Sequence, residues 1–318
     1  MLLSVIIPTY NRKKYLIESL DALARQSLPG DQYEVIVVDD GSIEEISEIK
    51  EMQFPYTLQY LRQENQGDAA ARNFGARHSQ TSLLVFLDDD MLVEDDYLAT
   101  MIEAHERSEK LVVMGTTHLW LGDNSSKFQS IYGISGFGNA NANPSFTQLC
   151  SNNMSVRRGD YFKIGMMENL GFPGSSIWCD VDFAYRAYKL GYEFYRTNMA
   201  IGYEKDYVAE NLSNASHRGY KMAYRAVALF QKHPDLIGHL PMFQDKTPVE
   251  WRSDELRLIL RKMVRRPASS RPIVFTMEQI VRKFEHHIPS PTWLRPLYRW
   301  IIGSYIFRGY REGLRDFK

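Results

Sequence analysis

Residues 83–90 read LLVFLDDD, an uninterrupted apolar run that ends in three consecutive carboxylates. A similar pattern occurs at residues 33–40 (YEVIVVDD), and residues 3–8 (LSVIIP) form a third run that ends at a proline. Short aliphatic and β-branched runs without polar alternation are typical of strands buried on both faces, as in a parallel sheet. The sequence therefore predicts three neighbouring buried strands.

Helical patterns separate these strands. Leu16, Ile17, Leu20, Leu23 and Ala24 recur at helical spacing, with Asn11 as the expected N-cap. Residues 68–79 (DAAARNFGARHS) are rich in the helix formers Ala and Arg. This alternation indicates βαβ units, hence an α/β fold with an open, mostly parallel sheet flanked by helices. In such sheets ligands bind beyond the carboxyl ends of the strands, where both acidic clusters fall.

The rest of the chain is organised differently. We expect a Gly/Asn-rich irregular region over about 115–150, a short helix over 180–190 closed by Gly191, and a helix over 216–232 stopped by Pro234. The expected organisation is one domain over 1–235, with a first half of about 1–115 and a second half of about 116–235, followed by a helical C-terminal region over 236–318.

The C-terminal region is basic although the whole chain carries a net charge of only −1. Residues 252–318 carry 15 Lys and Arg against 6 Asp and Glu, with Trp293, Tyr298 and Trp300 among the arginines. Such a segment can lie on an anionic membrane surface. It can equally be a helical subdomain whose aromatic residues pack on the rest of the protein, or a dimer interface. A nucleic-acid partner is not expected, because no recognised binding module accompanies the charge.

Composition bounds the class of protein. The 318 residues are 44% hydrophobic and 24% charged, as in an ordinary globular protein. Two cysteines, Cys150 and Cys179, favour a reducing compartment over a disulfide scaffold. The first residues lack the basic start and small-residue cleavage site of a signal peptide, and no apolar run reaches about 18 residues. We therefore expect a cytoplasmic protein, peripheral on the inner face of the cell membrane if the basic region binds lipid.

The triplet Asp88-Asp89-Asp90 is the sharpest chemical signal. In an extended segment Asp88 and Asp90 point to one face. Two carboxylates at a strand end suit Mg²⁺ or Mn²⁺, which keep further coordination positions for water and phosphate. The alternative is a solvated acidic turn or an N-cap for a helix that starts near Glu94, and the triplet alone does not decide between them.

Two further acidic motifs have the same ambiguity. The turn Asp39-Asp40-Gly41-Ser42 can offer a carboxylate to a base or ribose, or can simply close on itself through Gly41. Asp180 and Asp182 lie at a helix start, where acids favour the helix dipole, and where an ionised carboxylate can also act as a general base.

Other nucleotide and phosphate chemistries are disfavoured by missing motifs. No G-x-G-x-x-G follows the first strand, and the chain has no G-x-x-x-x-G-K-[ST]. A haloacid-dehalogenase-like phosphatase needs D-x-D-G after its first strand, but Val38 precedes Asp40 by two residues and Met91 follows Asp90. A nucleotidyltransferase would carry a Gly-rich basic loop after the first strand, which PTYNRKK is not.

Taken in order, these segments resemble a family 2 glycosyltransferase of the GT-A fold. The resemblance rests on SVIIPTYNR (4–12), VIVVDDGS (35–42), Asn65-Gln66-Gly67 with Ala71-Arg72-Asn73, VFLDDD (85–90), SNNMSVRR (151–158) with Phe162 and Gly165, and CDVDFAYRAYKLGY (179–192). It covers residues 3–200, about two-thirds of the chain. It implies an inverting, metal-dependent transfer from a nucleotide-diphosphate sugar (UDP-, dTDP- or GDP-linked) to a hydroxyl of a glycan, lipid-linked saccharide or small molecule.

The resemblance also implies roles for single residues. The donor nucleotide would be held by Pro8, Thr9, Tyr10, Asp39 and Arg72, with Asp88 or Asp89 touching the ribose or a metal-bound water. Asp90, together with Asp88, would bind Mn²⁺ or Mg²⁺, and Asp180 would be the catalytic base. Asn152, Asn153, Asp182 and Arg186 match positions near the acceptor or the active site.

Two positions depart from the family pattern. Cys179 stands where the family usually has Glu before the base, and Tyr203-Glu204 stands where relatives often have an aromatic residue followed by His. These departures keep a second hypothesis open, namely a catalytically weakened protein that binds a nucleotide sugar or scaffolds an assembly.

Overall fold

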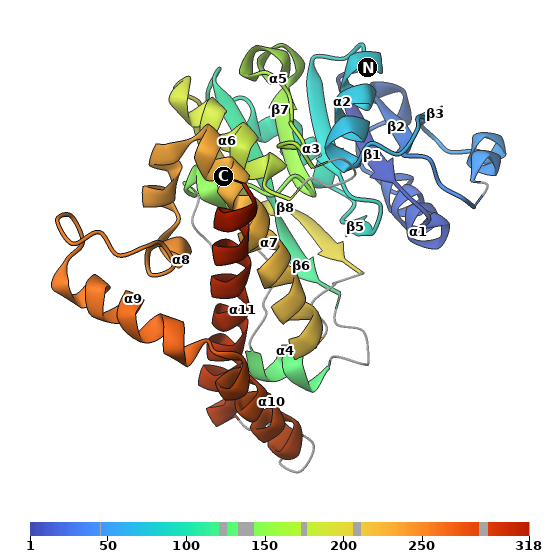
Figure 1. Cartoon of the computed structure of the whole chain (residues 1–318). Coiled ribbons are helices and arrows are strands. Elements are labelled where there is room, and N and C mark those ends of the chain that lie inside the picture. Colours follow the sequence, from blue (N-terminus) through green and yellow to red (C-terminus); the bar gives the residue numbers. More distant parts are fainter. Residues whose placement is uncertain are drawn as a thin grey trace. The chain divides into compact units, whose positions relative to one another are not determined.

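The structure is a computed structural model that describes residues 1–44, 46–120, 126–132, 143–172, 177–205, 211–285 and 292–317. The chain forms two compact units. One comprises Met1–Trp120 and Ser135–Asp206, and we call it the sheet unit. The other comprises Leu121–Ile134 and Tyr207–Lys318, and we call it the helical unit (Figure 1).

The first four strands of the sheet unit are parallel neighbours. Their order is β3 (Thr57–Arg62), β2 (Tyr33–Asp39), β1 (Leu3–Thr9) and β4 (Leu83–Leu87). All residues of β1 and β4 are buried, which explains why their sequences are continuous apolar runs. Helices α1 (Lys13–Leu23) and α2 (Asp68–His78) connect these strands as expected.

The second half of the sheet mixes strand directions. After β4 come β7 (Asn153–Arg157), β6 (Leu111–Leu119), β8 (Glu193–Glu204) and β5 (Met91–Val93), which completes one eight-stranded sheet in the described residues. Strand β7 is antiparallel to β4 and β6, and β5 is antiparallel to β8, while β6 and β8 are parallel. The expected parallel arrangement is therefore confirmed for the first four strands, and the complete sheet is mixed.

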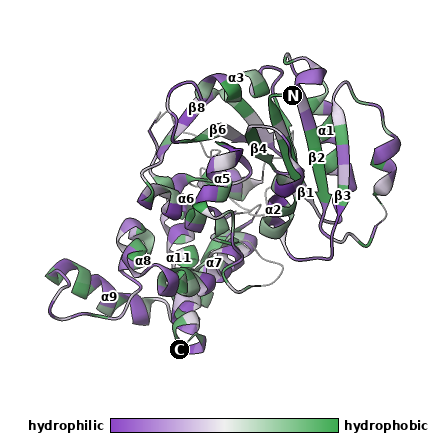
Figure 2. Ribbon diagram, turned by 90° about the horizontal axis from the view of Figure 1, so that it is seen from above, coloured by the Kyte–Doolittle hydropathy of each residue, from purple (hydrophilic) through white to green (hydrophobic). Residues whose placement is uncertain are grey.

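Helices cover the sheet and complete its core. The remaining helices of this unit are α3 (Tyr97–Ala104), α5 (Arg158–Ile164) and α6 (Cys179–Lys189). Leu16, Leu20 and Leu23 of α1 lie in a buried cluster with the strands, as their spacing predicts. Strands β1 and β2 are predominantly green in the hydropathy view of Figure 2, whereas purple recurs along the helices.

The entry to α1 differs from the expectation. Asn11 has a positive φ of 55°, and the N-cap is Arg12, which makes no side-chain cap hydrogen bond. Instead, the side-chain oxygen of Asn11 accepts a hydrogen bond from the amide of Ile43 at 2.7 Å. Asn tolerates this left-handed conformation better than most residues, so Asn11 joins the loops that follow β1 and β2 and does not cap the helix.

The helical unit is built around two long helices, α7 (Leu212–Lys232) and α11 (Arg295–Asp316). It also contains α4 (Lys127–Tyr132), α8 (Pro241–Gln244), α9 (Leu256–Ala268) and α10 (Arg271–Glu285). A Cβ added at Gly309 would lie 2.2 Å from the backbone oxygen of Tyr220, so only glycine permits this approach of α11 to α7. Because α7 packs on α11, it belongs to the helical unit, which differs from the expected boundary near residue 235.

The aromatic end of the chain forms a core. Tyr298 is fully buried, and Ile301 and Phe307 are at most 8% exposed. Tyr298 and Ile301 belong to the apolar interior of α11 and its neighbours, where Phe128 of α4 contacts the ring of Tyr298. This burial favours the packing interpretation of the aromatic segment over its use as a membrane anchor. No helix in the described ranges combines the length and the apolarity needed to cross a bilayer.

Candidate active site

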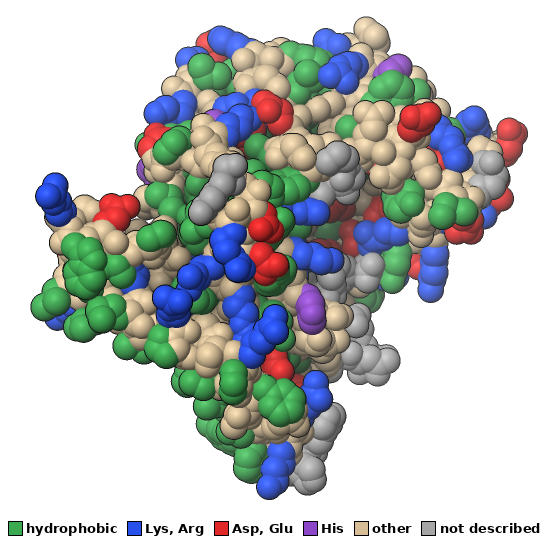
Figure 3. All heavy atoms as spheres, viewed as in Figure 1, with side chains coloured by type: hydrophobic (Ala, Val, Ile, Leu, Met, Phe, Trp, Pro, Cys, Tyr) green, Lys and Arg blue, Asp and Glu red, His purple; other side chains and the backbone are tan. Residues whose placement is uncertain are grey.

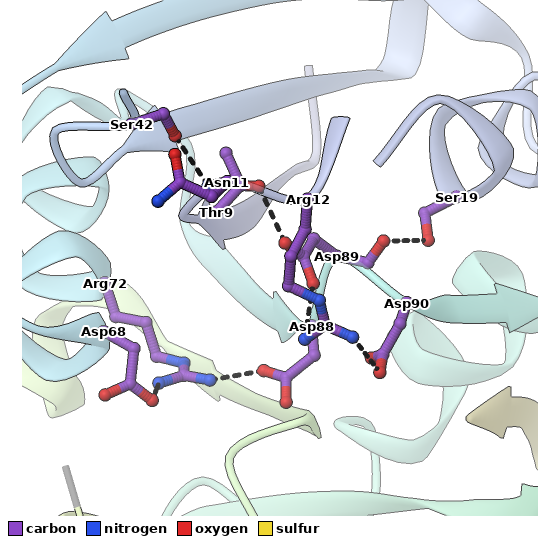
Figure 4. Close-up of polar contacts among 10 residues, drawn as sticks. All are labelled: Thr9, Asn11, Arg12, Ser19, Ser42, Asp68, Arg72, Asp88, Asp89 and Asp90. Atoms are coloured by element: carbon purple, nitrogen blue, oxygen red, sulfur yellow. Dashed lines mark hydrogen bonds and ion pairs between the residues drawn. The ribbon is translucent and has the colours of Figure 1, made fainter. Parts of the chain in front are cut away.

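The carboxyl ends of β1, β2 and β4 meet at one edge of the sheet. The amide of Asp40 donates to the backbone oxygen of Thr9 at 2.9 Å, which joins the ends of β2 and β1. The hydroxyl of Thr9 donates to Asp89 Oδ2 at 2.7 Å, which joins β1 to the segment after β4 (Figure 4). The parallel register thus brings three sequence motifs together, as strand-end geometry predicts.

The aspartate triplet is held by a residue that sequence reasoning missed. Arg12 places Nη1 3.2 Å from Asp89 Oδ1 and Nη2 2.7 Å from Asp90 Oδ2. The side chains of Asp89 and Asp90 are only 4% exposed, whereas that of Asp88 is 35% exposed. Burial raises the pKa of Asp89 to about 7, against the lowering effects of Arg12 and Thr9. Arg12 belongs to the PTYNR motif, but nothing in that motif indicates its partners.

Asp88 has a different cation. Arg72 of α2 is 1% exposed and pairs through its two terminal nitrogens with Asp68, at 2.7 Å, and with Asp88. Its Nε makes no hydrogen bond to the described residues. Asp68 was not predicted, although its position four residues before Arg72 on a helix was a usable signal for an ion pair. Figure 4 shows Arg72 between Asp68 and Asp88.

Asp180 lies at the first turn of α6. The residue before the helix, Trp178, has a left-handed backbone with φ of 74°, a strained conformation for a bulky residue. Asp180 Oδ1 accepts from the amide of Val181 at 2.8 Å. Burial raises the pKa of Asp180 to about 6, against lowering by this hydrogen bond and by the charge of Arg72. The charge of Arg72 also lowers the pKa of Asp88, with which Arg72 forms an ion pair.

Asp39 is fully buried and its carboxylate is already engaged. Oδ1 accepts from the amide of Ser42 at 2.8 Å, and Oδ2 accepts from the Tyr60 hydroxyl at 2.7 Å and lies 3.2 Å from Arg62 Nη1. Of the other residues expected to hold a nucleotide, Pro8 is buried in β1 and Tyr10 is 42% exposed beyond it.

Asp40 organises the turn before α2. Its carboxylate accepts from Gln63 Nε2 at 2.6 Å and from the amides of Gln66 and Gly67 at 2.9 and 2.7 Å. The closing turn also needs Gly41, which has φ of 82° and where a Cβ would lie 2.8 Å from the Asn65 nitrogen. Asp40 and Gly41 therefore form the closed turn that is one of the two interpretations of this motif.

The two asparagines before and in β7 differ in their surroundings. Asn153 locks the sheet, because its Oδ1 accepts from the Tyr97 hydroxyl at 2.8 Å and its Nδ2 donates to Thr117 Oγ1 at 3.2 Å. The backbone oxygen of Asn152 accepts from the amide of Asp88 at 3.2 Å. Its side-chain Oδ1 is buried and accepts no hydrogen bond from the described residues. A buried polar atom left unpaired in this way is costly unless a ligand or ion satisfies it.

Asp182 and Arg186 form a structural pair. Asp182 is fully buried, and its Oδ2 lies 2.9 Å from Arg186 Nε and 2.8 Å from Nη2. Arg186 also donates to the backbone oxygens of Ile164 and Met166 at 2.6 and 2.5 Å. The pair thus ties α6 to the turn after α5, so these residues position the helix that carries Asp180.

The cysteines lie at the same site. Cys179 is 2% exposed, and burial raises its thiol pKa well above its usual value, with Asp180 adding to the shift. Burial also raises the pKa of Cys150, and the charges of Asp180 and Asp88 act on it in the same direction. Both thiols therefore stay protonated, and Cys179 supplies no charge where a glutamate would.

The oxygen donors at this edge fit a hard divalent cation. Asp88 and Asp90 offer carboxylate oxygens, and Asn152 has the unpaired Oδ1 described above. Across the described part of the chain no three His, Cys, Asp or Glu side chains converge on one point. Mg²⁺ or Mn²⁺ bound here would therefore complete its coordination with water and phosphate oxygens, as these ions commonly do. It would also have to displace Arg12 from Asp90.

The family of this chain follows from a match to a known protein family. The model of glycosyl transferase family 2 matches residues 4–164, half of the chain, and this match spans β1 to the end of α5. The chain belongs to glycosyl transferase family 2. An uncharacterized glycosyltransferase of Bacillus subtilis, YfnE, is 42% identical over 114 residues, which covers 35% of this chain and 29% of that protein. The chain thus spans less than a third of that relative's length.

Solved structures extend the family relationship to the fold. A mannosyltransferase from Pyrobaculum calidifontis, determined with GDP-Man and Mn²⁺, superposes with a TM-score of 0.61 at 19% identity, covering 99% of this chain and 88% of that one. Residues 1–349 of Staphylococcus aureus TarS, determined with UDP, give a TM-score of 0.52 at 18% identity, covering 100% and 92%. The family 2 chain therefore has the GT-A fold, as its motifs indicated.

Proposed function

We propose that the protein is a metal-dependent, inverting glycosyltransferase that moves a sugar from a nucleotide-diphosphate donor to an acceptor hydroxyl. The acceptor would be a glycan, a lipid-linked saccharide or a small molecule. One observation carries the proposal: hydrogen bonds join the ends of β1, β2 and the segment after β4, so the motifs of the family lie at one edge of the sheet, with Arg72 paired to Asp88. The charge of Arg72 lowers the pKa of Asp88 and of Asp180 alike. The GDP-Man, UDP and Mn²⁺ bound by the structural neighbours support the donor class and the cofactor.

The donor would lie at the edge formed by β1, β2 and β4. The exposed ring of Tyr10 offers a stacking surface, and Thr9 and Asp39 hold the strand ends on which a base and ribose would rest. Asp90 and Asp88 would hold Mg²⁺ or Mn²⁺. The ion, when bound, neutralises charge that develops on the diphosphate leaving group.

The transfer itself would use Asp180. Its carboxylate accepts the proton of the acceptor hydroxyl while the hydroxyl oxygen bonds to the anomeric carbon. The bond between that carbon and the phosphate oxygen breaks, and its electron pair leaves with the nucleoside diphosphate. Attack from the face opposite the leaving group inverts the anomeric configuration. A base with a pKa near 6 is ionised at neutral pH and still basic enough to assist the attack.

A thermal-shift screen of UDP, GDP and dTDP, each with and without Mn²⁺, tests the donor site first. A ligand that binds only the folded state raises the apparent stability, by about 2.7 kcal/mol at a hundredfold excess over its Kd. We expect one nucleotide to stabilise the protein in a metal-dependent way, followed by release of that nucleotide from its sugar donor in a turnover assay. Stabilisation without turnover over an acceptor panel would favour the binding or scaffold hypothesis, and no stabilisation would contradict both.

A further inference from the structure

Helix α9 of the helical unit exposes apolar side chains along one stripe. Leu256, Leu260, Met263 and Val264 are 71%, 54%, 54% and 63% exposed. Their spacing of three and four residues places them on one face of the helix. We call these four residues the outer stripe. A soluble helix normally turns such a stripe toward the core.

The buried face of α9 carries one charged residue, Lys262. Lys262 is 7% exposed, and its ammonium group lies 2.6 Å from Asp254 Oδ2 and 3.0 Å from the backbone oxygen of Pro248. Ile259 is the only other residue of α9 classed as buried. The ion pair between Lys262 and Asp254 fixes which face of α9 is turned toward the helical unit. The outer stripe therefore points away from that unit.

Exposed apolar residues concentrate around this helix. Of the 17 large hydrophobic side chains found exposed in the described residues, eight lie between Met242 and Phe275. Among them is Trp251, which precedes α9 and is 72% exposed. In Figure 3 hydrophobic side chains gather at the left, over the start of α9, with basic side chains near them. Such a concentration of exposed apolar side chains is typical of an interaction site.

A cavity of about 460 Å³ adjoins the stripe. Leu260 and Val264 line it together with Asp245, Arg261, Arg265 and Trp300. Nε of Arg265 lies 4.0 Å from Asp245 Oδ2, so Asp245 already offsets that guanidinium charge. The apolar wall and the exposed Arg261 suit an amphipathic molecule with an anionic head, because each part meets its matching chemistry.

The charge around the stripe favours an anionic partner. Residues 252–271 contain seven basic residues and two acidic ones, and Lys262 is already paired internally with Asp254. In a symmetric dimer each stripe meets the same patch of the partner, which would bring these arginines together. A bilayer with anionic headgroups accepts the apolar stripe and attracts the arginines.

We propose that α9 docks the protein on an anionic phospholipid bilayer, with the outer stripe inserted at the interface and Arg257, Arg261 and Arg266 against the headgroups. The surface lies on the helical unit and does not depend on the chemistry proposed for the sheet unit. It moves the membrane contact expected from the sequence away from the aromatic end of the chain, where Trp293 is 48% exposed but Tyr298 and Phe307 are buried, to a helix with several exposed apolar residues.

The test is vesicle co-sedimentation of the full chain. Vesicles contain either phosphatidylcholine alone or phosphatidylcholine with 30% phosphatidylglycerol. We expect binding to the anionic vesicles at least tenfold tighter than to the neutral ones. The triple variant Leu256→Ser, Leu260→Ser, Val264→Ser should bind at least tenfold more weakly. The variant Arg257→Gln, Arg261→Gln, Arg266→Gln should lose the preference for anionic lipid.

A matched control separates insertion from general loss of surface apolarity. Tyr188→Ser, Leu190→Ser and Met199→Ser remove three exposed apolar side chains of the sheet unit and should leave binding unchanged. Unchanged thermal unfolding shows that each variant folds. The proposal is overturned if the wild type ignores anionic vesicles, or if the stripe variant binds them as well as the wild type. It is also overturned if light scattering finds a lipid-free dimer that the stripe variant converts to a monomer.

Discussion

Arg12 Nη2 lies 2.7 Å from Oδ2 of Asp90, and the same guanidinium group lies 3.2 Å from Asp89. A cation of the chain thus neutralises two nearly buried carboxylates at the place where a divalent ion is proposed to bind. Two buried carboxylates without such a partner would be strongly destabilising. The pair therefore explains how the folded protein keeps the triplet together when no metal is bound.

The first prediction concerns Arg12, the cation that pairs with Asp89 and Asp90 when no metal is bound. Arg12→Gln removes it, so in EDTA the free energy of unfolding should fall by about 1–2 kcal/mol, below the full cost of a broken buried pair because Arg12 is 32% exposed. Mn²⁺ should restore more stability to the variant than to the wild type. Urea unfolding with EDTA or Mn²⁺ measures both, and Arg25→Gln, an exposed pair, is the control. If Mn²⁺ stabilises Arg12→Gln and the wild type equally, the result would contradict the prediction that Arg12 and the metal ion occupy the same position beside Asp90.

Asp90→Ala is the second prediction. The variant removes the main proposed metal ligand, and it should lose Mn²⁺-dependent nucleotide binding in the thermal-shift assay. Because Arg12 retains Asp89 as a partner, the variant should still fold cooperatively. Asp95→Ala, an exposed acid nearby in the sequence, is the control. Metal-dependent binding that survives Asp90→Ala would remove this residue from the metal site.

The third prediction separates catalysis from donor binding. Asp180→Asn keeps the shape of the side chain but removes the proposed base, so turnover should fall about a thousandfold. The metal-dependent stabilisation by nucleotide should remain. Asp182→Asn is a structural comparison, because it leaves Arg186 without its buried partner and should lower thermal stability first. An Asp180→Asn enzyme with wild-type turnover would contradict the assigned base.

The strands could be predicted because their sequences reflect burial directly. Residues 3–8, 33–38 and 83–87 are continuous apolar runs, and they form β1, β2 and β4 almost to the residue. Parallel strands place their carboxyl ends at one edge, so the meeting of Thr9, Asp39 and the aspartate triplet also followed from the pattern. The family resemblance then supplied the proposed roles, and Asp180, the proposed base, lies at the first turn of α6.

Contacts between distant segments could not be predicted. Nothing in PTYNR indicates that Arg12 pairs with Asp90, which is 78 residues away. The direction of β7 depends on its pairing with β4, which is a tertiary property. Likewise, the sequence of α9 does not say which of its faces is buried, because the Lys262–Asp254 ion pair turns a charged residue inward and leaves aliphatic residues exposed.

The fourth prediction is the pH dependence of turnover. Asp180 must be ionised to accept a proton, and burial raises its pKa to about 6. We expect kcat/KM to be constant above that pH and to fall about tenfold per unit below it. Nucleotide affinity measured over the same range separates this effect from protonation of Asp89, whose pKa is about 7. A profile that stays flat to pH 5 while binding is intact would argue against a base with this pKa.

The fifth prediction concerns His105, which lies outside the proposed site. Burial lowers its pKa from 6.5 to about 4, with the charge of Arg157 adding to the effect, and its Nε2 lies 2.9 Å from Ser155 Oγ. The imidazole of His105 therefore binds a proton more readily in the unfolded chain than in the folded one. Above about pH 6.5 His105 is neutral in both states, and its contribution to the free energy of unfolding is complete. As the pH falls toward 4 this contribution is lost, and the free energy of unfolding is about 3 kcal/mol lower at pH 4.

His105→Gln tests this contribution. The substitution itself should cost stability at pH 7, because it disturbs a buried contact, but it should flatten the fall in unfolding free energy between pH 7 and pH 4.5. Urea unfolding at several pH values gives the slope. His78→Gln, on an exposed side chain at the end of α2, should reproduce the wild-type slope. If His105→Gln keeps that slope as well, the acid sensitivity of the fold arises from other groups, such as carboxylates held in ion pairs.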